Sequence, residues 1–257
     1  MSTLPRFELR YFQLMARGLS PALVAEHSGL SWAGNKTLVF DTTDHWAALK
    51  PSTPFGQLPL LTVPGSNFQV AQTTAIISYI GRISGSESSA TSDRSDLYAL
   101  SQMLLAEAED IYNLMVRFLP TPYKRLSSDG VLTSKGTAED YDAFWATLLP
   151  THLANLERLL PFTSPASGAS HQKYLCGELH AFAMLYQAHL VRPSIFAGTP
   201  GLEGWFDALK TDRRTRSVLS GESPMGKLEQ YFLEAGSARI CELGDERGRW
   251  GWGDHLK

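Results

Sequence analysis

The sequence predicts an α+β protein in two parts: a small mixed sheet with helices on its faces, followed by an all-helical region. Two observations predict this. Over about the first 83 residues, short apolar or alternating runs are separated by turn residues, whereas after residue 97 apolar residues recur at steps of three and four. The stretch 85–96 between them is rich in Ser, Asp and Glu and has almost nothing to bury. We therefore predict domains at 1–84 and 97–234, a linker at 85–96 and a glycine-rich tail at 235–257.

The first part is predicted to follow the order β-α-β-α-β-β-α. Residues 6–12 alternate and are rich in aromatics, as in a half-buried strand. Ser20 and Pro21 then provide an N-cap and a proline for the first turn of a helix. The other expected elements are a strand at 36–40, a helix at 44–49, strands at 58–63 and 68–71 around a Pro-Gly-Ser-Asn turn, and a helix from 72 to 83.

The second part is predicted to be entirely helical. One long amphipathic helix is marked by an apolar stripe that recurs every three or four residues: Leu97, Leu100, Leu104, Ala108, Ile111, Met115 and Phe118. A second helix is expected over 144–160, with a kink at Pro150. Shorter helices are expected at 180–191, 204–209 and 224–233.

Composition argues against several classes of protein. Apolar runs are far shorter than the ~18 residues that span a bilayer, and no basic-then-apolar leader opens the chain. A net charge of -3 gives no general attraction to nucleic acid or anionic lipid. Cys176 and Cys241 are too few for a disulfide framework or a four-thiolate metal site, and the seven histidines lack metal-binding spacing. We expect a cytoplasmic protein with no metal and no nucleic-acid or membrane partner.

The most specific local feature is the segment Pro54-Phe-Gly-Gln-Leu-Pro59-Leu-Leu. A proline inside an apolar strand removes a donor from the ladder, so Pro59 should lie at a sheet edge or a turn. If its peptide bond is cis, the backbone N–H and C=O of Leu58 face outward and can pair with a peptide-like ligand. An ordinary edge-strand proline is the alternative interpretation of the same residues.

Four motifs follow one another along the first part of the chain: Tyr11-Phe12 with Arg17 six residues on, Trp46-Ala-Ala-Leu-Lys50-Pro51, Pro54-Phe-Gly-Gln-Leu-Pro59 and Gln72-Thr73. Together they resemble the glutathione transferase family, in particular its tyrosine-type sigma class, which includes the glutathione-dependent prostaglandin D synthases. The likeness is dense to about residue 83 and weaker to about residue 232, where 224–232 resembles the family's last common helix. It implies a thioredoxin-like N-terminal domain, an all-helical C-terminal domain, a homodimer, and glutathione as co-substrate with no metal.

The resemblance also implies a role for each matching residue. Leu58, ahead of Pro59, would pair its backbone with the cysteinyl part of glutathione like an added strand, with Gln57 close to the same backbone. Thr73 and Gln72, at a helix start, would hold the γ-glutamyl carboxylate. The glycyl carboxylate would be bound by two residues four apart on a short helix, Trp46 and Lys50.

Tyr11 is the candidate catalytic residue that the resemblance implies. A thiol of pKa ~8.5 is mostly protonated at neutral pH, and a phenol that donates a hydrogen bond to sulfur stabilises the reactive thiolate. Arg17 would add positive field or brace the loop after the first strand. On its own, Tyr11 is also compatible with an aromatic side chain at a strand end.

An acidic residue on the long helix is implied to reach across the dimer to the γ-glutamyl ammonium. Asp110 matches this position, and Glu107 and Glu109 compete for the role.

One departure concerns a capping box, Ser/Thr-x-x-Asp, that starts a buried helix in many family members. An ungapped match places Ala181 and Met184 at those two positions, so this cap is expected to be missing or rebuilt.

Three functions follow from these observations. The first is a transferase in which a tyrosine activates glutathione for attack on a hydrophobic electrophile. The alternatives are a glutathione-dependent isomerase and a non-catalytic binding or structural protein of the same fold.

Overall fold

A mixed four-stranded sheet forms one side of the protein. The computed structural model describes residues 6–34, 48–87, 95–121, 138–162 and 174–235. Within these ranges the strands are β1 (Phe7–Arg10), β2 (Trp32–Gly34), β3 (Leu60–Thr62) and β4 (Gln69–Ala71), in the order β2-β1-β3-β4. β1 runs parallel to β2 and antiparallel to β3, with Leu9 opposite Leu61, and β3 and β4 form an antiparallel hairpin. The expected hairpin and the mixed sheet are confirmed.

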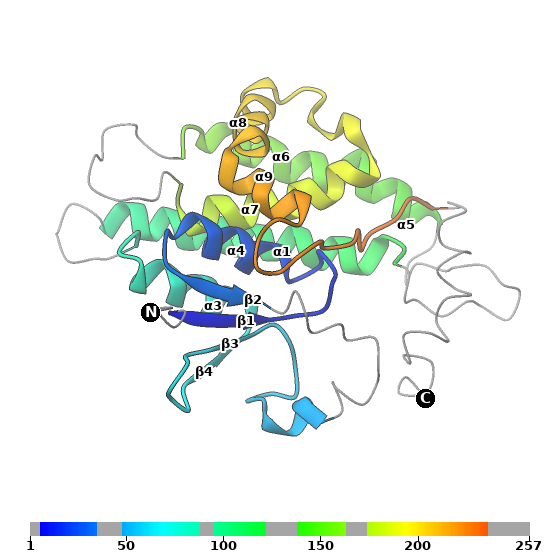
Figure 1. The fold of residues 1–257 in the computed structure, drawn as a ribbon. Helices are drawn as coiled ribbons and strands as arrows, with labels where there is room; N and C mark the ends of the chain where they lie inside the picture. The colour runs from blue at the N-terminus through cyan, green and yellow to red at the C-terminus, as the bar shows by residue number, and fades with distance from the viewer. Residues whose placement is uncertain (1–5, 35–47, 88–94, 122–137, 163–173, 236–257) are drawn as a thin grey trace, which may run out of the picture.

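Two helices, α1 (Leu19–His27) and α3 (Thr73–Ile83), lie between this sheet and the helical region (Figure 1). In α1, eight of nine residues are buried, because the sheet covers one side and the helical region covers the other. α3 is amphipathic and buries Ile76, Ile77 and Ile80. The short 3-10 helix η1 (Lys50–Ser52) lies on the far side of the sheet (Figure 1).

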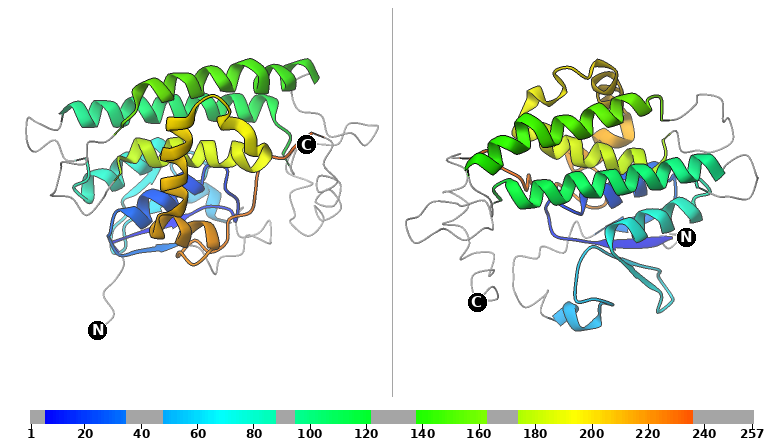
Figure 2. Two further views of the ribbon diagram at one scale, coloured as in Figure 1. Left: turned by 90° about the horizontal axis from the view of Figure 1, so that it is seen from above. Right: turned by 180° about the vertical axis from the view of Figure 1, so that it is seen from behind.

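The helical region begins with the long helix α4 (Ser95–Phe118), which buries the predicted stripe from Leu104 to Phe118. The elements after it are α5 (Ala138–Ala143), the π-helical turn η3 (Phe144–Leu148), α6 (Leu149–Leu159), α7 (Cys176–Val191), the 3-10 helix η4 (Pro193–Phe196), α8 (Pro200–Thr211) and α9 (Arg213–Ser220). α4 and the α5–α6 segment run side by side (Figure 2). α7 has 13 of its 16 residues buried and packs against both α4 and α1. None of the helices in the described ranges is long and apolar enough to cross a membrane.

Several expected elements differ from the structure or lie outside it. The strand expected at 36–40 lies outside the described residues, as does most of the helix expected at 44–49. The second strand of the described sheet is instead Trp32–Gly34. Ser20 is not the N-cap of α1: the cap is Gly18, and the Ser20 hydroxyl lies 2.8 Å from Nδ1 of His180. A π-helical turn immediately precedes α6 and Pro150 lies in the first turn of α6, so the expected kink at Pro150 stays a prediction.

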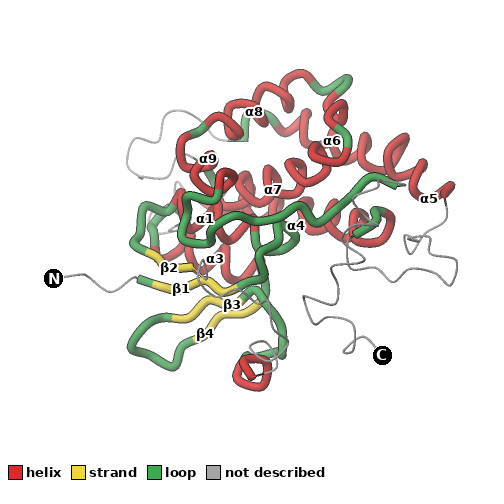
Figure 3. Tube along the Cα trace, turned by 45° about the vertical axis from the view of Figure 1, so that its right-hand side comes forward, coloured by secondary structure: helices red, strands yellow, loops and turns green. Residues whose placement is uncertain are grey.

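The prediction of a helix at 224–233 is wrong, because this segment is irregular; we call it the strap (Figure 3). Its backbone pairs with the loop after β1: Glu229 N–H donates to Gln13 O at 3.0 Å, and Met15 N–H donates to Glu229 O at 2.8 Å. Gly226, with φ +69°, interrupts any helical path. The three- and four-residue spacing of Met225, Leu228 and Phe232 therefore reflects burial of an irregular chain rather than a helix.

The expected cap of α7 is rebuilt from side chains distant in sequence. The N–H of Cys176 donates to Oε1 of Glu87 at 3.1 Å, and the N–H of Gly177 donates to Oγ of Ser101 at 2.9 Å. Ser101 in turn donates its hydroxyl to Glu87, and the Glu178 carboxylate accepts the N–H of Leu175 at 2.8 Å. The first backbone donors of the helix are therefore satisfied without a Ser/Thr-x-x-Asp box.

Two buried residues make this junction possible. A Cβ on Gly177 would lie 2.2 Å from the carbonyl oxygen of Ser101, so only glycine fits where α7 meets α4. Glu87 is buried although it lies in the stretch 85–96, which from sequence has almost nothing to bury. The division of the chain at 84/85, 96/97 and 234/235 stays a prediction.

We expect Glu87→Ala to lower the free energy of unfolding by about 1–3 kcal/mol, because it leaves the N–H of Cys176 and the hydroxyl of Ser101 without their acceptor.

Burial raises the pKa of Glu87, so the folded state holds this proton more tightly than the unfolded chain does. The contribution of protonated Glu87 is therefore present at low pH and is lost as pH rises through the folded pKa. Glu87→Gln should become progressively more stable relative to wild type as pH rises from the ordinary glutamate pKa of 4.5 through the raised folded pKa. Denaturant unfolding at several pH values measures both effects, with exposed Glu234→Gln as the control. Parallel pH curves for Glu87→Gln and wild type would refute this assignment.

Candidate functional site

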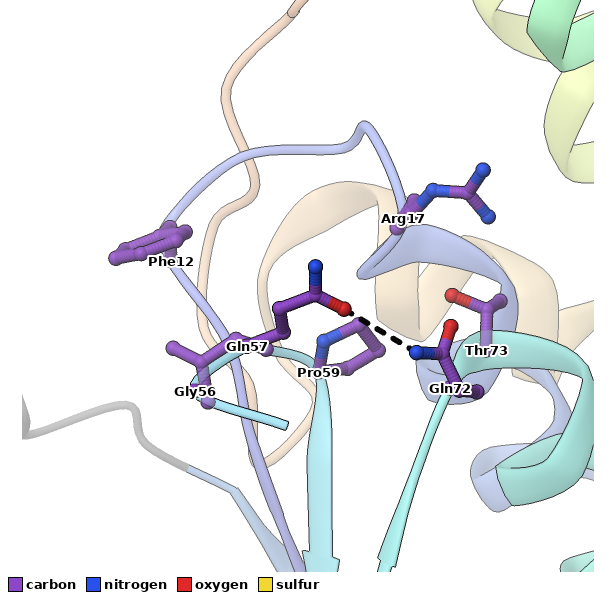
Figure 4. Close-up of a pocket in the computed structure, with 8 residues that line it drawn as sticks. Phe12, Arg17, Gly56, Gln57, Pro59, Gln72 and Thr73 are labelled. Atoms are coloured by element: carbon purple, nitrogen blue, oxygen red, sulfur yellow. Dashed lines mark hydrogen bonds between the residues drawn. The ribbon is translucent and has the colours of Figure 1, made fainter. Parts of the chain in front are cut away.

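A cleft of about 490 Å³ opens where three segments of the sheet domain meet. They are the loop after β1, the segment before β3, and the junction of β4 with α3 (Figure 4). The residues that line the cleft are Phe12, Arg17, Gly56, Gln57, Leu58, Pro59, Gln72 and Thr73. Six of these were predicted as site residues from the sequence: Arg17, Gln57, Leu58, Pro59, Gln72 and Thr73.

The Leu58–Pro59 peptide bond is cis, as the sequence-based interpretation required for an outward-facing Leu58 backbone. Pro59 leads directly into β3, whose first residue, Leu60, pairs with Arg10 on one side and Ala71 on the other. Leu58 therefore lies just outside the hydrogen-bonded ladder. Its peptide groups are placed where an extended ligand could continue the pairing.

The opposite wall of the cleft is the start of α3. Gln72, the residue before the helix, has φ +74° and ψ +126°, a conformation that L-residues rarely adopt. Its side-chain amide donates to Oε1 of Gln57 at 3.2 Å across the cleft (Figure 4). Because the first backbone N–H groups of a helix have no intrahelical acceptor, this wall presents donors to the cleft.

Thr73 is the first residue of α3 and is only 3% exposed, yet its hydroxyl oxygen has no hydrogen-bond partner among the described residues. A buried hydroxyl without a partner costs free energy and is usually explained by a water, ion or ligand. Two donors belong to this part of the lining, the Thr73 hydroxyl and the Gln72 amide, and Arg17 lies at its edge, where its Nη1 is paired with Glu109. Among the residues that the structure describes, no Asp or Glu lines the cleft. The arrangement suits a carboxylate.

Tyr11 does not line the cleft in the part of the chain that is described; its neighbour Phe12 does. The Tyr11 side chain is 8% exposed, and its hydroxyl oxygen accepts the backbone N–H of Arg17 at 3.3 Å. Its ring packs on Gly18, where a Cβ would lie 2.2 Å from Cδ1 of the tyrosine. The loop therefore folds around Tyr11 and places its oxygen beside the backbone of Arg17.

Arg17 is held by groups from the helical region. Its Nη1 donates to both carboxylate oxygens of Glu109, at 2.9 and 2.8 Å, and its guanidinium carbon lies 4.3 Å from the ring centroid of Tyr112. Burial by itself would raise the pKa of Glu109, but the contact with His180 and the charge of Arg17 outweigh it and hold that pKa below its ordinary value. Burial raises the pKa of Tyr112, so its phenol remains protonated.

The three acidic candidates on α4 have different environments. Glu107 contacts Nδ1 of His152 at 2.6 Å, and Glu109 pairs with Arg17. Asp110 is exposed. Glu107 and Glu109 are thus engaged within their own chain, whereas Asp110 faces solvent in the isolated protein.

Of the two residues predicted to bind a glycyl carboxylate, Trp46 lies outside the described residues. Lys50 is exposed at the start of η1, and its Cε would lie 3.4 Å from a Cβ on Gly56, which places the lysine chain at the margin of the cleft. Gly56 has φ +60°, so glycine is favoured there for its backbone as well. Phe12 and Gly56 are lining residues that were not predicted, although both lie inside the quoted motifs.

Across the described ranges, no three His, Cys, Asp or Glu side chains gather as potential metal ligands.

Known proteins provide three relevant comparisons. Over 79 residues the chain is 39% identical to glutathione S-transferase 1 of Ascaris suum, a match that covers 31% of this chain and 35% of that protein. The crystal structure of the glutathione S-transferase from Ascaris lumbricoides superposes with a TM-score of 0.61 and 20% identity, over 86% of this chain and 98% of that one. Prostaglandin synthase D of Nilaparvata lugens superposes with a TM-score of 0.60 and 15% identity, over 84% and 98%.

No family model matches the sequence. The sequence match spans about a third of the curated relative, while the structural likeness extends over most of the chain. The shared architecture is a thioredoxin-like sheet domain followed by a helical domain: this chain has the fold of the glutathione S-transferases.

Proposed function

We propose that this protein is a glutathione transferase that binds glutathione in the cleft between Leu58 and Thr73. The observation that carries the proposal is the buried hydroxyl of Thr73 at the start of α3, which has no hydrogen-bond partner among the described residues and lies in the same cleft as the cis Leu58–Pro59 bond. Glutathione offers the complementary groups, since it combines a γ-glutamyl carboxylate with a peptide backbone.

The binding mode follows from the position of each wall. The γ-glutamyl carboxylate accepts hydrogen bonds from Thr73, Gln72 and the first turn of α3. The cysteinyl N–H and C=O pair with the backbone of Leu58. The glycyl end then points toward η1, where Lys50 lies at the margin and Trp46 is the sequence-predicted partner.

Tyr11 is proposed to stabilise the thiolate, which makes this a tyrosine-type enzyme. Its oxygen accepts the backbone N–H of Arg17, a contact that polarises the phenol, and Arg17 adds positive charge nearby. In the reaction the thiol loses its proton to solvent, sulfur forms a bond to the electrophilic carbon, and the leaving group departs with its electron pair. A hydrophobic electrophile is the proposed second substrate.

Isomerisation is the second candidate activity. The structural likeness to a prostaglandin synthase supports isomerisation as a candidate, and it supports the proposed assignment to the sigma class as well. In that case sulfur adds to the substrate and leaves again, so glutathione is not consumed. The third candidate is a non-catalytic protein, which would bind glutathione without turnover. A cytoplasmic location and a role in detoxification belong to the same proposal.

We further propose a homodimer in which Asp110 of each chain reaches the glutathione site of the other. Glu107 and Glu109 are engaged within their own chain, whereas Asp110 is exposed on α4. A carboxylate presented there would pair with the γ-glutamyl ammonium of glutathione bound to the partner.

We expect Thr73→Val to weaken glutathione binding about tenfold or more, because it removes a hydrogen bond to a charged carboxylate. The same substitution should stabilise the protein without ligand by about 1 kcal/mol, since an isosteric methyl replaces a buried hydroxyl that lacks a partner. Calorimetric titration and denaturant unfolding measure the two effects. Thr73→Ser, which keeps the hydroxyl, should bind within a few-fold of wild type. Binding by Thr73→Val at wild-type affinity would exclude this hydroxyl from the site, and a wild-type protein that does not bind glutathione would refute the proposed function.

Tyr11→Phe should lower turnover with an aromatic electrophile by roughly 10–100-fold while glutathione affinity changes little. The hydroxyl serves the thiolate, whereas carboxylate and backbone contacts provide the binding. Steady-state kinetics separate the two quantities, and thiolate absorbance of the complex reports the thiol directly. Wild-type turnover in the purified variant would remove Tyr11 from the mechanism.

Asp110→Asn should weaken glutathione binding about tenfold and leave the dimer intact, because a neutral amide cannot match the charge of the ammonium. Light scattering gives the oligomeric state and calorimetry the affinity. The matched control is Glu107→Gln, which alters a carboxylate on the same helix that already contacts His152. A monomer at micromolar concentration would disprove the shared site, as would a dimer in which Asp110→Asn binds glutathione normally.

A further inference from the structure

His180 is a buried, polar side chain that the proposed reaction does not use. It lies on α7, is 1% exposed, and is enclosed by α1 and α4. Its Nδ1 lies 2.8 Å from the hydroxyl of Ser20 on α1, and its Nε2 lies 3.2 Å from Oε1 of Glu109 on α4. The imidazole therefore connects two helices through its two nitrogens.

The chemistry of its neighbours fixes the protonation of this ring. An ionised Glu109 can only accept, so the proton of a neutral imidazole is required on Nε2. Nδ1 is then an acceptor and takes the hydrogen of the Ser20 hydroxyl. Burial lowers the pKa of His180, which agrees with a neutral ring. This tautomer satisfies Ser20 and places a donor on Nε2, which approaches Oε1 of Glu109 to 3.2 Å without the geometry of a hydrogen bond in the structure as it stands.

Glu109 stands between His180 and the cleft. Its carboxylate accepts twice from Nη1 of Arg17, and its Oε1 also faces His180. The ion pair occupies a single guanidinium nitrogen, so Nε and Nη2 of Arg17 are not consumed by Glu109. Figure 4 shows the guanidinium pointing away from Gln57 and Gln72, toward the helical region that supplies Glu109.

We propose that His180 is a positioning residue for Arg17 and acts through Glu109. The imidazole holds the carboxylate in one orientation, and that orientation holds the guanidinium at the edge of the cleft over the Tyr112 ring. The orienting role stands on these contacts alone. Its consequence for the thiolate rests on the proposed function.

If His180 only filled space among its neighbours, it would not need the polar nitrogens of an imidazole. An apolar side chain would fill the space among α1, α4 and α7 without the desolvation that an imidazole incurs. The hydrogen bond at Nδ1 to α1 and the charged Glu109 oxygen of α4 lying 3.2 Å from Nε2 are instead what an orienting role requires.

Replacing His180 by glutamine or by asparagine tests the contacts of its two ring nitrogens separately. In His180→Gln the longer side chain carries its N–H to the position of Nε2, so Glu109 keeps a donor while Ser20 loses its acceptor. In His180→Asn the shorter side chain places its carbonyl near Nδ1, so Ser20 keeps an acceptor while Glu109 loses its donor. Both variants bury one primary amide, so general damage to packing is matched. His27→Asn controls for loss of a buried histidine elsewhere, since His27 contacts Thr215 and does not line the cleft.

The readout is nitrogen-15 NMR of the Arg17 guanidinium in protein without glutathione, with the signal assigned by Arg17→Lys. We expect water exchange of the Arg17 N–H groups to be at least about tenfold faster in His180→Asn, and within about twofold of wild type in His180→Gln and His27→Asn. With glutathione bound, His180→Asn should lower kcat roughly threefold to tenfold and leave KM for glutathione within about twofold.

Equal exchange rates in His180→Asn and His180→Gln, whether both fast or both slow, would overturn the proposal. So would fast exchange in His27→Asn, because the effect would then reflect loosened packing. Failure of wild type to bind glutathione would refute the proposed function, while the exchange rates would still decide the role of His180. If His180→Asn does not fold, Glu109→Gln provides the same exchange test, since a neutral amide cannot hold Arg17 by charge, and wild-type exchange in that variant would overturn the proposal.

Discussion

The packing of α1 against α7 is the contact on which the rest of the molecule depends. Both helices are buried almost all round, α1 because it lies between the sheet and the helical region, and α7 because it lies between α1 and α4. The loop that feeds α1 runs from Tyr11 to Gly18, so fixing α1 also fixes the residues that close one side of the cleft. Neither part buries its apolar surface without the other. The cleft is therefore formed by the sheet domain but held in place by the helical region.

Much of this fold could be predicted from local sequence. The alternation around Phe7 and Leu9, the Pro-Gly-Ser-Asn turn and the stripe on α4 are signals within one element, and all three were interpreted correctly. The strap at 224–233 was not, because Glu229 pairs its backbone with the loop after β1 instead of forming helical bonds, while a side chain such as Phe232 still packs on Tyr112 of α4. Apolar spacing reports burial, and only backbone pairing decides the element. The residues that cap α7 could not be predicted either, since Glu87 and Ser101 are distant from the start of this helix in sequence.

The candidate site likewise contains residues that local sequence could predict and residues that it could not. Gln57, Leu58, Pro59, Gln72 and Thr73 lie in short motifs, so a resemblance of motifs was enough to find them. Phe12 lines the cleft where Tyr11 was expected, because the loop turns the tyrosine onto Gly18 and exposes its neighbour. Glu109 and Arg17 are 92 residues apart, and His180 is 160 from Ser20. No periodicity or spacing connects such pairs; only the packing of α1, α4 and α7 brings them together.

One turn of α4 faces two environments. Successive residues on an α-helix point about 100° apart, so two adjacent carboxylates can lie in different environments. Glu109 points inward, to Arg17 and His180, and the next residue, Asp110, is exposed. The burial of α4 by Ala108, Ile111 and Tyr112 fixes which of the two is inside. Any displacement of this turn would move the carboxylate that holds Arg17 and the one on the surface together. One turn of α4 thus connects the edge of the cleft, through Glu109 and Arg17, with the outer face of the helix, through Asp110.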